Sequence, residues 1–110
     1  MSKKIVILGA GESGCGTAIL AKKKGFNVFV SDLFSITDSA KYLFKNLEIE
    51  WEEEAHTITK MQDAHYIVKS PGIPSKTPLV QSLGATDIPI VSEIEFASKF
   101  TKATLIGITG

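Results

Sequence analysis

Short apolar runs alternate along the chain with stretches of helical spacing. Residues 4–8 form a continuous apolar run after a polar lead, which is typical of a strand buried on both faces of a parallel sheet, and residues 27–31 predict a second strand. Between them, residues 13–24 have helical spacing with lysines in the last turn. Gly25 then stands where a helix C-cap is expected.

The same alternation continues after the second strand. Thr37 or Asp38 is expected to cap a helix that runs to about residue 47, and residues 48–51 are expected to form a short third strand. The remaining predicted elements are a strand at 65–69, a helix from the Thr77-Pro78 pair to Gly84, a strand at 88–91, a helix opened by a Ser92–Glu95 capping box, and a strand at 103–109. This order predicts an α/β fold, a Rossmann-like, mostly parallel sheet of five to six strands with helices on both faces.

A glycine-rich loop joins the first strand to the first helix. Its sequence, Gly9-Ala10-Gly11-Glu12-Ser13-Gly14, has the spacing G-x-G-x-x-G. The first glycine permits a tight turn, the second lets a phosphate approach the backbone, and the third permits close packing of helix on strand. Free N–H groups at the helix start form a site for a diphosphate, and the Ser13 hydroxyl adds a donor. A purely structural turn is the alternative, but the position between strand and helix favours phosphate binding.

Asp32 ends the predicted second strand, 18 residues after Gly14. A carboxylate at this position faces the ligand crevice and accepts hydrogen bonds from a ribose diol or an imide N–H. The alternative interpretation is a turn or N-cap aspartate, and the spacing favours the nucleotide contact.

Other chemistry-bearing residues predict no second site. Cys15 stands near a helix N-terminus, where a thiol can become reactive, but a small packed side chain is the favoured interpretation. His56 and His65 lack metal-ligand spacing, and His65 is expected to be structural within a strand. The acidic run at 52–54 is expected to be a solvated surface. We therefore expect no metal ligands.

Charge and cysteine content narrow the function classes. Lys plus Arg and Asp plus Glu both number 12, so no basic excess favours nucleic acid or an anionic membrane as a partner. Apolar runs are far shorter than the roughly 20 residues of a membrane span. A single cysteine excludes an internal disulfide and fits the reducing cytoplasm.

Three segments together resemble the Mur ligase family over the whole chain. They are the glycine loop with the following Ser31-Asp32, the run Val68-Lys69-Ser70-Pro71-Gly72-Ile73-Pro74, and Ser92-Glu93-Ile94-Glu95-Phe96 with the closing Ile106-Gly107-Ile108-Thr109-Gly110. The Ser-Pro-Gly-Ile-Pro form favours the branch of the family that adds D-glutamate.

The resemblance implies that residues 1–110 are one N-terminal, UDP-binding domain. The family's enzymes add a central ATPase domain and a C-terminal domain, and they activate the substrate carboxylate with ATP and Mg²⁺. The implied substrate is UDP-N-acetylmuramoyl-L-alanine. Only Thr109 and Gly110 of the family's ATP loop are present. We therefore expect that residues 1–110 hold no catalytic residue and no cofactor of their own. We also expect the protein to be cytoplasmic and monomeric.

The resemblance also implies roles for individual residues. The diphosphate would meet Gly11, Glu12, Ser13 and Gly14; the uracil would meet Asp32, Leu33 and Phe34; the wall of the pocket would be Ser70, Pro71, Gly72 and Ile73. Relatives often carry a basic residue at the position of Phe34, where an aromatic ring can stack instead.

Two other function classes fit part of the pattern. An NAD-binding module of a dehydrogenase or redox-sensing protein explains the glycine loop and Asp32 equally well. A flavodoxin-like interaction domain needs no nucleotide at all. The NAD-binding module gives no account of the Ser70-to-Pro74 segment. Both classes remain alternatives to the uridine-nucleotide interpretation.

Overall fold

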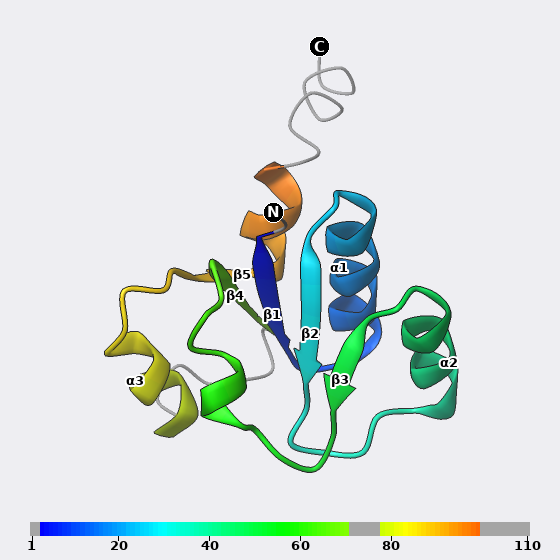
Figure 1. Ribbon diagram of the computed structural model, residues 1–110, viewed down its shortest axis with the longest axis horizontal. Helices are drawn as coiled ribbons and strands as arrows, with labels where there is room; N and C mark the ends of the chain where they lie inside the picture. The colour runs from blue at the N-terminus through cyan, green and yellow to red at the C-terminus, as the bar shows by residue number, and fades with distance from the viewer. Residues whose placement is uncertain (1–2, 71–77, 100–110) are drawn as a thin grey trace.

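Five parallel strands form one sheet in the order β3-β2-β1-β4-β5 (Figure 1). The structure is a computed structural model and describes residues 3–70 and 78–99. The strands are β1 (Lys4–Leu8), β2 (Asn27–Ser31), β3 (Glu50–Glu52), β4 (Tyr66–Lys69) and β5 (Ile90–Ser92). The predicted parallel α/β fold is confirmed. The sixth strand predicted at 103–109 lies outside the described residues.

Helices cover both faces of the sheet. One face packs against α1 (Glu12–Lys23), α2 (Asp38–Asn46) and Phe96 of the helical residues 93–99. The other packs against the segment after the 3-10 helix η1 (Ile58–Lys60) and against α3 (Pro78–Gly84). Successive residues of β1 point to opposite faces of the sheet. Because both faces are covered, all four residues from Ile5 to Leu8 are fully buried.

The predicted C-terminal end of α1 and the predicted start of α2 are confirmed by their hydrogen bonds. Gly25 has a φ of 90° and donates its N–H to the Lys22 carbonyl at 3.1 Å, while the Phe26 N–H reaches the Ala21 carbonyl at 3.1 Å. This pair is a Schellman motif with glycine at the left-handed position. At the start of α2, the Thr37 hydroxyl accepts the Ala40 N–H at 3.2 Å.

The end of α2 corrects one prediction. Glu48 was expected to open the third strand, but it has a φ of 59° and its N–H bonds the Lys45 carbonyl. The Ile49 N–H reaches back to the Phe44 carbonyl at 2.8 Å, so α2 also ends in a Schellman motif. β3 therefore begins two residues later than expected, at Glu50. A glutamate in place of the usual glycine conceals this helix end in the sequence.

The end of β5 carries the predicted capping box. The Ser92 hydroxyl accepts the Glu95 N–H at 3.1 Å, and the Glu95 carboxylate accepts the Ser92 N–H at 3.3 Å. Between them Glu93 is buried, and its Oε1 has no hydrogen-bond partner within residues 3–70 and 78–99. Nothing in the described part of the chain explains this orphan oxygen.

Candidate functional site

The glycine loop has the geometry of an anion-binding turn. Gly9 has a φ of 98°, and its N–H bonds the Ser31 carbonyl at 2.8 Å. Gly11 is the N-cap of α1 and gives the helix no side-chain cap. The N–H groups of the first turn therefore have no partner within the helix. Glu12 and Ser13 are exposed there, as a ligand contact requires.

Gly14 is the glycine that the packing demands most strictly. A Cβ added there would lie 2.0 Å from the Gly9 carbonyl oxygen. The third glycine of the motif thus lets α1 start directly against the loop, as the sequence predicts. At Gly16, two residues further along the helix, an added Cβ would meet nothing within 4 Å.

Asp32 links the glycine loop to the loop after β2. Its Oδ2 accepts the Ala10 N–H at 2.8 Å and its Oδ1 accepts the Phe34 N–H at 2.8 Å. The turn interpretation of Asp32 therefore describes part of its role. Each carboxylate oxygen has two lone pairs, so Asp32 keeps acceptor capacity for a ligand.

Leu33 and Phe34 project from the loop after β2. The two residues are 56% and 75% exposed, so both side chains are accessible to a ligand. On the other side of β1, Ser70 follows β4, and its N–H bonds the Leu8 carbonyl at 3.2 Å. Pro71, Gly72 and Ile73, which were expected to form the pocket wall, lie outside the described residues.

The segments predicted to bind one ligand follow three strands that are neighbours in the sheet. The loop that begins with Asp32, the glycine loop and Ser70 follow the carboxyl ends of β2, β1 and β4, toward which the arrowheads point in Figure 1. The chain crosses from β1 to β2 in one direction and later returns to add β4 on the other side of β1. The site therefore lies at the switch point of the sheet, where ligands of open α/β folds bind.

A partly buried polar network next to this site was not predicted. The Ser31 hydroxyl, fully buried at the end of β2, lies 2.8 Å from Glu52 Oε2, 2.7 Å from His56 Nδ1 and 3.1 Å from the Ala55 carbonyl. Glu52 also accepts the N–H and the hydroxyl of Thr57 at 2.7 and 2.6 Å. The expectation that this acidic run is a solvated surface was wrong for Glu52 and Glu53, whose carboxylates bond Ser31 and Ile36, and is confirmed for Glu54, which is exposed.

The two shortest contacts of the Ser31 hydroxyl, to Glu52 and His56, favour one arrangement of protons. Ser31 has a single hydroxyl proton, while Glu52 and the Ala55 carbonyl are acceptors only. We therefore assign the proton to His56 Nδ1, which donates to Ser31 Oγ. A histidine that donates to a serine is not its general base, so this cluster is not a nucleophilic triad.

Burial and hydrogen bonding set the charges of the network. Burial lowers the pKa of His56, outweighing the attraction of Glu52 and Asp32, so the ring is neutral at pH 7. Burial acts to raise the pKa of Glu52, but hydrogen bonds from Thr57 and Ser31 outweigh it and lower that pKa. The network thus pairs a neutral imidazole with a charged carboxylate.

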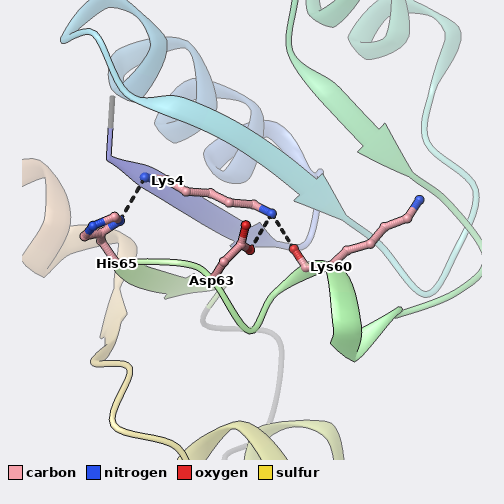
Figure 2. A network of polar contacts seen from close by, with 4 residues as sticks. All are labelled: Lys4, Lys60, Asp63 and His65. Atoms are coloured by element: carbon pink, nitrogen blue, oxygen red, sulfur yellow. Dashed lines mark hydrogen bonds and ion pairs between the residues drawn. The ribbon is translucent and has the colours of Figure 1, made fainter. Parts of the chain in front are cut away.

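The remaining candidates have structural roles. Cys15 packs partly buried against the core, and burial raises the pKa of its thiol, so the packing interpretation is confirmed. His65 lies just before β4 rather than within it, and its Nδ1 accepts the Lys4 N–H at 3.1 Å (Figure 2). Across the described ranges, no cluster of three or more metal-ligating side chains occurs, and no helix is long and apolar enough to cross a membrane.

Comparison with known proteins agrees with this geometry. Residues 3–92 match the family described as Mur ligase MurD-like, N-terminal domain. The chain is 58% identical over its full length to the UDP-N-acetylmuramoylalanine–D-glutamate ligase of Christiangramia forsetii, and 53% identical over 98% of its length to that of Bacteroides thetaiotaomicron. It spans only about a quarter of these relatives, 25% and 24%.

A solved structure shows the same fold. The murein peptide ligase of Psychrobacter arcticus aligns with 89% of this chain at a TM-score of 0.80 and 23% identity, and the match covers 20% of that protein. The sequence matches favour the Mur ligase resemblance over the NAD-binding alternative. The chain belongs to the family of MurD-like N-terminal domains of Mur ligases.

Proposed function

We propose that this chain is the UDP-binding N-terminal domain of a cytoplasmic ligase that adds D-glutamate to UDP-N-acetylmuramoyl-L-alanine. The observation that carries the proposal is the position of the glycine loop, Asp32 and Ser70 at the carboxyl ends of the neighbouring strands β1, β2 and β4. Relatives named as D-glutamate ligases share the whole of this chain at up to 58% identity. Residues 1–110 act as one monomeric substrate-binding domain in this proposal.

The diphosphate binds at the start of α1. The N–H groups of Glu12, Ser13 and Gly14 have no helical partner and lie at the positive end of the helix dipole. Gly11 leaves room for the phosphate. A Cβ added to Gly11 would point into open space, with no atom within 4 Å, and because glycine has no Cβ this space stays free for the ligand. The exposed Ser13 hydroxyl supplies a further donor.

The uracil binds over the loop after β2. Asp32 accepts the imide N–H with the lone pairs that its two backbone bonds leave free. The exposed Leu33 and Phe34 side chains supply apolar surface for the base, with the Phe34 ring able to stack on it. Ser70, with Pro71, Gly72 and Ile73, forms the opposite wall.

ATP and Mg²⁺ belong to the longer enzyme in this proposal. The described residues offer no carboxylate cluster that fits a metal ion. Thr109 and Gly110, the start of the expected ATP loop, lie outside those residues. What this chain contributes is the binding and orientation of the nucleotide end of the substrate.

Calorimetric titration of the 110-residue chain with UDP and with NAD tests the proposal. UDP should bind more tightly than NAD. Asp32→Ala should weaken UDP binding by about 1–3 kcal/mol, the range for losing a charge-assisted hydrogen bond. Asp63→Ala, an aspartate at the opposite end of the sheet, should leave binding unchanged. Tighter binding of NAD, with UDP silent, would support a dehydrogenase or redox-sensing module instead.

A further inference from the structure

Residues 52–57, called the brace below, are tied to the loop that carries the proposed base-binding residues. Glu53 Oε1 accepts the Ile36 N–H at 2.9 Å, and Glu53 Oε2 pairs with Lys41 Nζ at 2.6 Å. Ile36 is buried and Lys41 belongs to α2. The Glu53 and Lys41 side chains are only 28% and 31% exposed. The Glu53 carboxylate therefore fixes the far end of the loop of residues 32–36, called the base-binding loop below, to α2, the helix that follows it.

Backbone hydrogen bonds join the brace to the same loop along its length. The Asp32 N–H bonds the Glu52 carbonyl at 3.1 Å, and the Ala55 N–H bonds the Asp32 carbonyl at 3.3 Å. The Glu54 N–H bonds the Phe34 carbonyl at 3.2 Å. These bonds continue the pairing of β2 with β3 beyond the strand ends, where the two loops run side by side in Figure 1.

The brace is itself anchored in the interior. Glu52 and His56 hold the fully buried Ser31 hydroxyl, and Thr57 closes the network on the Glu52 carboxylate. A buried, satisfied polar network rigidifies its surroundings, because each group would be costly to leave unpaired. The brace therefore offers the base-binding loop a fixed support.

The middle of the loop needs such a support, because only Ile36 at its far end is packed in the core. Leu33 and Phe34 are mostly exposed, so their burial contributes little to fixing the backbone. A loop that is ordered before the ligand arrives avoids the entropy cost of ordering on binding. The hydrogen bonds from Lys41 and from the Ile36 N–H lower the pKa of Glu53, so the carboxylate stays charged at neutral pH.

We propose that Glu53 is a positioning residue for base recognition: it holds the loop of residues 32–36 in the shape that binds the pyrimidine without touching the ligand. The inference rests on the proposed uridine-nucleotide site. It separates two parts of that site, because the diphosphate binds at the start of α1, whereas Glu53 contacts Ile36 and Lys41 at the far end of the braced loop.

The test compares two ligands on the 110-residue chain, UDP and inorganic diphosphate. Glu53→Ala should weaken UDP binding about three- to tenfold, the range for losing the prior ordering of one or two side chains. Diphosphate affinity should stay within about twofold, since its contacts are on α1. Glu53→Gln should restore much of the UDP affinity, because its amide oxygen still accepts the Ile36 N–H. Glu50→Ala, which removes an exposed glutamate of β3 outside the brace, is the matched control and should change neither affinity.

Two outcomes would overturn the proposal: unchanged UDP affinity in Glu53→Ala, or an equal loss of affinity for both ligands, which would mean general destabilisation.

Amide hydrogen exchange provides a readout without ligand. Glu53→Ala should speed exchange of the Ile36 and Phe34 amides and leave β1 protected, and unchanged exchange would also overturn the proposal. Absence of UDP binding by the unaltered chain would instead contradict the proposed function, while the exchange experiment still judges the brace.

Discussion

Each end of the parallel sheet carries a polar network that contains one carboxylate and one histidine, but the two networks lie in different surroundings. At the amino end, Lys4 Nζ pairs with Asp63 at 2.8 Å and also donates to the Lys60 carbonyl, and the Lys4 N–H donates to His65 (Figure 2). Asp63 is 74% exposed. Water competes for these groups, so the network contributes little to stability.

The network at the carboxyl end has similar distances but is centred on a hydroxyl that lies inside the protein. Ser31 and Glu52 are 2.8 Å apart, as are Lys4 and Asp63, yet Ser31 is fully buried. Removing one buried partner leaves the others unpaired, which costs more than the bond itself contributes. Burial rather than distance therefore decides which network matters, and the buried one supports the end of the sheet where ligands bind.

The largest effect is expected from adding a side chain where α1 packs closely against the glycine loop. Gly14→Ala should destabilise the fold by at least about 3 kcal/mol or prevent folding, because its Cβ would overlap the Gly9 carbonyl. Gly16→Ala is the control in the same helix and should stabilise it by about 0.5–1 kcal/mol. Denaturant unfolding measures both. Equal stability of the two variants would contradict the close approach of α1 to the loop.

Truncating the buried network should have the next largest effect. Ser31→Ala should lower the free energy of unfolding by about 1–3 kcal/mol, because Glu52 and His56 each lose a partner in a buried site. Thermal or denaturant unfolding measures the change. A loss below about 0.5 kcal/mol would show that water replaces the hydroxyl readily, and the contrast between the two ends would disappear.

The pH dependence of stability should depend on His56. Because burial lowers its folded-state pKa, the unfolded chain binds the proton first as the pH falls below about 6.5. The free energy of unfolding should therefore decrease as the pH falls from 6.5 toward the lower folded-state pKa. The partly exposed ring is screened, so we expect a loss of no more than about 1 kcal/mol. His56→Gln should flatten this slope, whereas the control His65→Gln should retain it.

The smallest effect is expected at the exposed amino end. Asp63→Asn removes the ion pair with Lys4 and should cost only about 0.2–0.5 kcal/mol, less still at high salt. Comparing unfolding at low and high salt checks this value. A cost as large as that of Ser31→Ala would contradict the argument from burial.

The sequence predicted the elements whose signals are local. Residues 4–8 and 27–31 were assigned correctly because buried parallel strands are continuous in apolar side chains. Thr37, Gly25 and the Ser92–Glu95 box marked helix ends correctly, because each cap bonds residues within a few positions of itself. The glycine loop was predictable for the same reason.

The features that the sequence did not predict depend on contacts between distant residues. Glu48 adopts a left-handed conformation that is usual for glycine, so its residue type conceals the end of α2. The brace begins with the acidic run at 52–54, and such a run by itself indicates a solvated surface. Its carboxylates reach residues 17 to 21 positions away, Ile36 for Glu53 and Ser31 for Glu52, and only the parallel pairing of β2 with β3 brings them together.

The contrast between the two ends of the sheet can be tested directly by mapping nucleotide binding with NMR. UDP should shift the amide resonances of residues 12–14, 32–34 and Ser70 together, all at the carboxyl end. NAD at the same concentration should shift them much less. The amides of Lys4, Lys60, Asp63 and His65, at the amino end, should not respond. Shifts concentrated at the amino end, or a stronger response to NAD, would contradict a uridine-nucleotide site at the carboxyl ends of β2, β1 and β4.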